Sequence, residues 1–180
     1  GDNTAYNNGR LTLNPLAHLD PVGTFMILFI GIGYAKPVPV NPYNLSNPRI
    51  DMIKVAAAGP ISNLILSFIS LFILYLINPD TNSNIFILLS IMIHINTALA
   101  VFNLLPVYPL DGGQIFGNLI SKYNPTLAQN LLNYGPKVLL GVILFGLFSG
   151  KSILWLIIGP LINTILWFFE LIIGFIFKIF

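Results

Sequence analysis

Residues 85–113 read IFILLSIMIHINTALAVFNLLPVYPLDGG, an apolar run that ends in two prolines, one aspartate and two glycines. An apolar run of this length is typical of a helix that crosses the hydrocarbon core of a membrane. The two prolines end that helix, and Gly112-Gly113 begins the next. A carboxylate at the end of such a run is costly, so Asp111 is a candidate for an ion, proton or metal site. The alternative is that Asp111 is a helix N-cap just outside the hydrocarbon.

The composition of the whole chain agrees with a membrane protein. Of its 180 residues, 56% are hydrophobic and only 8% are charged, and the mean hydropathy is +0.84. A soluble domain of this size could not bury so much apolar surface. The stretches Val55–Ile77 and Ile85–Leu105 are each long enough to cross a bilayer. A third region, Val138–Phe177, can cross twice with a turn at residues 149–152, or once after a helix that lies on the surface.

The stretch Val22–Tyr34 is too short to cross, because a helix of this length reaches only about 20 Å. A re-entrant or partly inserted element fits it better. The following residues, Ala35–Val40, contain alternating prolines, which withdraw backbone donors and favour an extended chain. Open strands leave amides unpaired in lipid, so we expect this extended segment to be shielded by protein or to lie in the interface.

The charged residues predict how the chain is oriented in the membrane. If it crosses at 55–77, 85–105, 138–148 and 152–176, seven basic residues lie on one side, whereas Lys151 and Asp80 lie on the other. The positive-inside rule makes the first side cytoplasmic and places Asp111 near the cytoplasmic interface. The net charge of +2 is too small and too dispersed to indicate binding of nucleic acid.

A set of ordered motifs points to one protein family. Asn103, Pro106, Asp111 and Gly112 follow the pattern Asn-x-x-Pro-x-x-x-x-Asp-Gly. Six further blocks precede it: GDNTA (1–5), GRLTLNPL (9–16), HLDPVGT (18–24), AKPVPVNP (35–42), NPR (47–49) and AGPISN (58–63). Together they resemble the site-2 protease family of intramembrane zinc metalloproteases, in its compact prokaryotic branch. The resemblance covers roughly residues 1–120, and residues 121–180 are expected to add transmembrane helices.

The resemblance implies an all-α polytopic protein of the cell membrane, with a short re-entrant or extended β element near the active site and a single membrane-embedded domain over residues 1–180. It implies hydrolysis of peptide bonds in transmembrane or membrane-associated proteins, within or near the lipid bilayer, with Zn²⁺ as cofactor. Asp111 would be the third protein ligand of the zinc. Substrate would add as a strand to the extended segment.

Asn63 and Asn103 are the predicted catalytic side chains. Asn63 ends a Gly-x-x-x-Asn element that begins at Gly59, and its amide could reach the substrate backbone or a developing oxyanion. Helix packing with an interhelical hydrogen bond is the alternative. The amide of Asn103 could orient Asp111 or substrate, or satisfy carbonyls that Pro106 leaves free.

The family's His-Glu-x-x-His helix does not occur in these residues. Two histidines one turn apart would bind the zinc there, and the glutamate would activate its water. We therefore expect a chain that is truncated at its N-terminus and inactive alone. His18 and His94 each lack a histidine partner at the i+4 spacing, and we interpret them as a loop side chain and as a core imidazole bonded to a neighbouring helix.

Two other functions remain open. The first is a non-catalytic pseudoprotease that still binds substrate segments through Ala35–Asn41 and Asn63. The second is a small transporter or channel subunit in which Asp111 and His94 line a pathway, although no internal repeat supports it.

Overall fold

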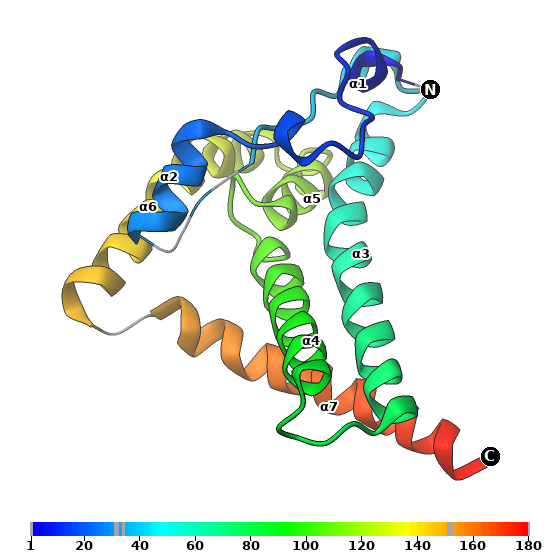
Figure 1. Ribbon diagram of the computed structural model, residues 1–180. Helices are drawn as coiled ribbons and strands as arrows, with labels where there is room; N and C mark the ends of the chain where they lie inside the picture. The colour runs from blue at the N-terminus through cyan, green and yellow to red at the C-terminus, as the bar shows by residue number, and fades with distance from the viewer. Residues whose placement is uncertain (1, 31–32, 34, 151–152, 180) are drawn as a thin grey trace. The chain divides into compact units, whose positions relative to one another are not determined.

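The structure, a computed structural model, describes residues 2–30, 33, 35–150 and 153–179 (Figure 1). This part of the chain consists mainly of helices and contains no β-strand. The elements are α1 (Thr4–Asn7), η1 (Pro15–Ala17), α2 (Pro21–Ile30), η2 (Pro42–Asn44), α3 (Pro48–Ile77), α4 (Asn84–Asn103), α5 (Asp111–Ile120), α6 (Pro125–Ser149) and α7 (Ile153–Ile179).

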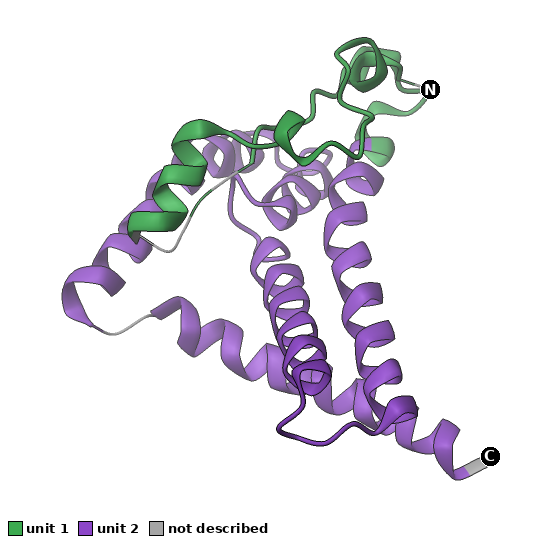
Figure 2. Ribbon diagram, viewed as in Figure 1, with its two compact units in different colours: residues 1–51 green, residues 52–180 purple. Residues whose placement is uncertain are grey.

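The chain divides into two compact units, residues 1–51 and residues 52–180 (Figure 2). We describe each unit by itself. The expectation of one membrane-embedded domain over the whole chain stays a prediction.

The first unit contains the two segments expected to be re-entrant and extended. Helix α2 has 10 residues, so it is only about 15 Å long and cannot cross a bilayer. Residues 31, 32 and 34 of the expected re-entrant stretch lie outside the described residues. The β element is not confirmed, because the described part of this unit has only an isolated antiparallel bridge between Leu19 and Ala35.

Within the described residues, four helices are long and apolar enough to cross a membrane: α3, α4, α6 and α7. Helices α3 and α4 contain the two spans expected from the sequence. Asn47 and Asp51 define the start of α3, where the Asp51 carboxylate accepts a hydrogen bond from the Asn47 amide at 2.9 Å. Ser83 caps α4 by accepting from the Phe86 amide.

The sequence prediction for the third apolar region needs one correction. We expected a short first crossing from Val138, whereas α6 begins at Pro125 and is 25 residues long. Asn124 caps this helix by accepting from the Leu127 amide, and the polar residues of its first turns hid its true start. Gly150 ends it with φ +67°, a left-handed conformation that favours glycine. Lys151 and Ser152 of the expected turn lie outside the described residues.

Apolar contacts of α7 with α3 and α4 form the core of the second unit. Leu71, Ile93 and Ile173 are buried together, one from each helix. Val101 of α4 packs separately against Ile158 and Ile162 of α7. Most of the remaining apolar side chains on these helices are exposed, as expected for surfaces that face lipid.

A buried polar contact joins α3 to α4. The hydroxyl oxygens of Ser67 and Thr97 lie 2.7 Å apart, and both side chains are fully buried. The Ile93 carbonyl lies 3.1 Å from the Ser67 hydroxyl and 2.8 Å from the Thr97 hydroxyl, so one hydroxyl donates to this carbonyl while it accepts from the other hydroxyl. Hydroxyls of this kind hold neighbouring membrane helices together.

Candidate functional site

The loop between α4 and α5 positions Asp111. Leu110 occupies the N-cap position of α5, and Asp111 is its first residue. Gly112 is buried, and a Cβ atom at this position would overlap the backbone carbonyls of Leu104 and Leu105. Only glycine therefore lets the loop lie this close to α5, which explains why glycine follows the aspartate in the motif.

The Asp111 carboxylate faces α3. A Cβ atom built on Gly59 would lie 3.3 Å from Oδ2 of Asp111, so the absence of a side chain at Gly59 makes room for the carboxylate. Asp111 is half-buried, and the N-cap position of α5 belongs to Leu110, so the interpretation of Asp111 as an N-cap is wrong. Desolvation by burial raises the pKa of this carboxyl above its ordinary value.

Asn63 lies one helical turn after Gly59 on α3. Residues four apart share a helix face, so Asn63 is on the side of α3 that carries Gly59. Its side chain is half-buried, and no hydrogen bond to it is found among the described residues. The structure thus brings the Gly-x-x-x-Asn element to Asp111 through Gly59, and the catalytic role of Asn63 stays a prediction.

Asn103 is the last residue of α4 and is half-buried. In the part of the chain that is described, its amide has no hydrogen bond to Asp111 or to a carbonyl near Pro106. Both interpretations of Asn103 therefore stay predictions.

Neither histidine lies in the core. Nδ1 of His94 lies 2.8 Å from the Ser90 carbonyl of its own helix, and the side chain is exposed. The expected bond to a neighbouring helix is therefore wrong. His18 is a loop residue, as expected, and its Nε2 lies 2.9 Å from the Thr12 carbonyl.

Tyr108 lies in the loop between α4 and α5, residues 104–110, which we call the motif loop. The sequence did not single this residue out. A Cβ atom on Gly117 of α5 would overlap its hydroxyl, and one on Gly135 of α6 would overlap its backbone. Tyr108 thus anchors the motif loop between two helices, and burial raises the pKa of its hydroxyl. In the sequence this arrangement corresponds to one glycine in each of two helices. Nothing local marks these glycines as neighbours of Tyr108, and only the packing of the helices shows it.

The residues present do not complete a zinc site. Catalytic zinc takes three protein ligands and keeps one position open. The described residues contain no group of three His, Cys, Asp or Glu side chains that could hold a metal ion. Asp111 supplies one suitable oxygen donor, and no reaction step through a metal follows from this structure.

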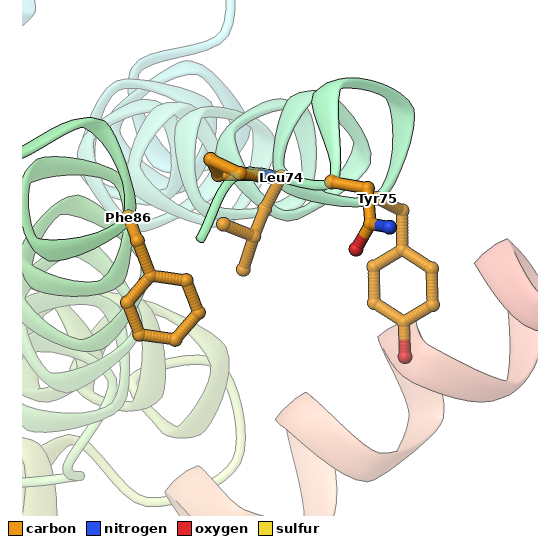
Figure 3. A pocket seen from close by; sticks show the side chains of 5 residues that line it. Leu74, Tyr75 and Phe86 are labelled. Atoms are coloured by element: carbon orange, nitrogen blue, oxygen red, sulfur yellow. The ribbon is translucent and has the colours of Figure 1, made fainter. Parts of the chain in front are cut away.

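The described residues of the second unit line at least three apolar cavities, and Asp111 is not among the lining residues of these three. The first, about 190 Å³, lies where α3 ends and α4 begins, and Figure 3 shows Leu74, Tyr75 and Phe86 around it. The second, about 260 Å³, lies between the motif loop and α6, where Val107 and Gly135 form part of its lining. The third, about 330 Å³, lies between α4 and α7.

Comparison with known proteins gives consistent matches. The sequence profile of Peptidase family M50 matches residues 78–144. Over 173 residues the chain is 41% identical to the putative zinc metalloprotease YwhC of Bacillus subtilis, a match that covers 91% of this chain and 75% of that protein.

Two archaeal proteins of Methanocaldococcus jannaschii also match. Zinc metalloprotease MJ0392 is 32% identical over 112 residues, which is 61% of this chain and 32% of that protein. Putative zinc metalloprotease MJ0611 is 30% identical over 104 residues, which is 58% of this chain and 51% of that protein. No solved structure matches the chain.

Proposed function

The chain belongs to peptidase family M50, the site-2 protease family, and on this premise we propose that it is an intramembrane metallopeptidase that hydrolyses peptide bonds of membrane proteins within or at the edge of the bilayer. Its four apolar helices support a membrane location. The family membership does not favour a transporter or a non-catalytic binding protein.

One observation carries this proposal to particular residues. The Asp111 carboxylate lies against Gly59 and is partly desolvated, and no hydrogen bond or ion pair to it is found in the described residues. A partly buried carboxylate that bears a desolvation cost is what a metal-ligand position at membrane depth predicts.

The proposed metal is zinc, which the names of the relatives support. Asp111 is its proposed ligand within residues 1–180. We propose no further zinc ligand among the described residues. Asn63 and Asn103 are the proposed side chains that contact the substrate backbone, since their amides have no other partner in the described part of the chain.

The proposed substrate is a transmembrane or membrane-associated protein. Its scissile segment is extended, because a helical peptide bond is enclosed in its own hydrogen bonds. The segment 35–41 is the proposed docking segment, to which the substrate adds as a strand through backbone hydrogen bonds.

The test uses the protein as its gene encodes it, purified in detergent. We expect zinc to be retained by the unchanged protein and to fall strongly in Asp111→Ala, together with loss of cleavage of a synthetic transmembrane substrate with a helix-destabilised centre.

Asp80→Asn is the matched control, because Asp80 is an exposed carboxylate in the α3–α4 loop of the same unit. It should retain both zinc and activity. Undiminished cleavage by Asp111→Ala would refute the ligand assignment, and absence of cleavage by the unchanged protein with zinc bound would refute the peptidase.

A further inference from the structure

The segment 36–41 is held at its first end by Arg10. Gly9, with φ +62°, turns the chain after α1 so that Arg10 points inward, and the side chain is buried with 8% of its surface exposed. Its guanidinium donates to the carbonyls of Ala17, Lys36 and Pro37. One cation therefore binds the start of the segment to the η1 turn.

A second contact holds the same end. The Lys36 amide donates to the His18 carbonyl at 2.9 Å. Beside it, Leu19 and Ala35 form the isolated antiparallel bridge. The first end of the segment is thus attached to the preceding loop by backbone as well as by Arg10.

Asp2 holds the other end. One carboxylate oxygen accepts from the Asn41 amide at 2.8 Å. The other accepts from the Asn44 side chain at 2.8 Å and from Thr4. These hydrogen bonds hold the pKa of Asp2 well below its usual range, so the carboxylate stays charged under ordinary conditions.

Between the two fixed ends, only two residues offer backbone donors. Pro37 and Pro39 have no amide hydrogen. The amides of Val38 and Val40 have no hydrogen-bond partner among the described residues. The alternating prolines favour an extended chain here, and in an extended chain residues two apart direct their amides to the same edge, so we infer that both free donors lie on one edge.

We propose that Asp2 and Arg10 are positioning residues that hold 36–41 as a preformed edge for an extended substrate segment, whose backbone carbonyls accept hydrogen bonds from Val38 and Val40. This inference rests on the proposed function. An edge that is already ordered does not lose conformational entropy when the substrate binds, so affinity is higher than for a free loop. Loss of either positioning residue raises KM and leaves the chemical step unchanged.

The experiment reads the two amides directly. The segment 36–40 has two prolines, and Lys36 becomes the free terminus of that fragment, so its measurable amides in hydrogen exchange are those of Val38 and Val40. Exchange is measured on the full-length protein in detergent, with and without a synthetic apolar peptide of about 20 residues, the length of one span. A zinc chelator prevents cleavage during this measurement.

The variants are Asp2→Asn and Arg10→Gln, with Arg10→Lys as the conservative exchange that keeps a charged donor for the carbonyls. Asp20→Asn is the matched control for Asp2→Asn, and Arg49→Gln is the matched control for Arg10→Gln. Each control removes a charge of the same sign as its variant does, from the same unit. Asp20 accepts from the Gly23 amide instead, and no contact of Arg49 with 36–41 is found in the described residues.

The peptide should slow exchange at 36–40 in the unchanged protein and in both controls. In Asp2→Asn and Arg10→Gln this protection should disappear, and KM should rise about fivefold with kcat within about twofold and zinc content unchanged. Arg10→Lys should restore part of the protection. If Asp2 and Arg10 had a purely structural role, kcat and zinc content would fall together in Asp2→Asn and Arg10→Gln.

Two results would overturn the inference: no protection of the two amides by the peptide in the unchanged protein, or full protection and unchanged KM in both variants. If the peptide protects the two amides but the protein cleaves no substrate, the proposed function is refuted, whereas the inference that 36–41 binds an extended segment is retained.

Discussion

At the scale of single residues, Asp111 carries a cost that a metal ion would remove. Burial raises its pKa, so the folded chain holds this proton more tightly than the unfolded chain does. Above the raised pKa the carboxylate is charged in both states, and only the folded state bears the desolvation of that charge. The destabilisation is therefore present at high pH and is relieved as the pH falls through the raised pKa.

Asp111→Asn should accordingly stabilise the metal-free protein at neutral pH. The amide has no charge to desolvate, and we expect Tm to rise by about 2 °C, measured by thermal unfolding in detergent with a chelator present. Asp80→Asn, at an exposed carboxylate, should leave Tm unchanged. A lower Tm in Asp111→Asn would mean that the carboxylate has a stabilising partner in the metal-free protein.

Gly112 gives a second prediction at this scale. Gly112→Ala should destabilise the second unit by about 2 kcal/mol, because the new Cβ atom would overlap backbone that cannot move aside cheaply. The free energy of unfolding in detergent measures this. Gly141→Ala in α6 is the matched control, since a Cβ atom there meets nothing within 4 Å, and alanine favours the helix. Equal stability of the two variants would contradict the close approach of the loop to α5.

At the scale of helices, α3 and α4 are joined by the buried hydroxyls of Ser67 and Thr97. A double-mutant cycle with Ser67→Ala and Thr97→Val should show a coupling energy of about 0.6 kcal/mol, the average for such bonds in membrane proteins. Ser70→Ala is the control, because the Ser70 hydroxyl donates to the Leu66 carbonyl of its own helix. It should show no coupling to Thr97→Val. Strict additivity at Ser67 and Thr97 would show that the contact does not stabilise the pair.

At the scale of the whole molecule, orientation in the membrane is the property to test. The chain contains no cysteine, so single cysteines can be introduced without other changes. Asn82→Cys in the α3–α4 loop should react with an impermeant thiol reagent in intact cells. Lys122→Cys, between α5 and α6, should react only after permeabilisation, because the positive-inside rule makes its side cytoplasmic.

The reverse labelling pattern would refute the predicted orientation. Labelling of both cysteines in intact cells would mean that α4, which lies between the two positions, does not cross. Such a result would also show that sufficient length and apolar composition do not by themselves lead to membrane insertion.

Much of the fold could be predicted from local sequence. An apolar run of sufficient length predicts a span wherever it occurs, and the prolines and glycines of 106–113 place the break between α4 and α5 correctly. The start of α6 could not be predicted in this way, because the polar side chains of its first turns give no apolar signal. The hydrogen bond of the Asn124 cap determines it instead.

By itself, the sequence determined that this is a helical membrane protein of the site-2 protease family and that Asp111 is its principal candidate ligand, because composition, apolar length and motif spacing are properties of continuous segments. Only the tertiary structure decided that Gly59 makes room for the Asp111 carboxylate, that Tyr108 lies between Gly117 and Gly135, and that Asp2 and Arg10 fix the two ends of 36–41. These contacts join residues far apart in the chain, and which side chains meet depends on how all the elements of a unit pack at once.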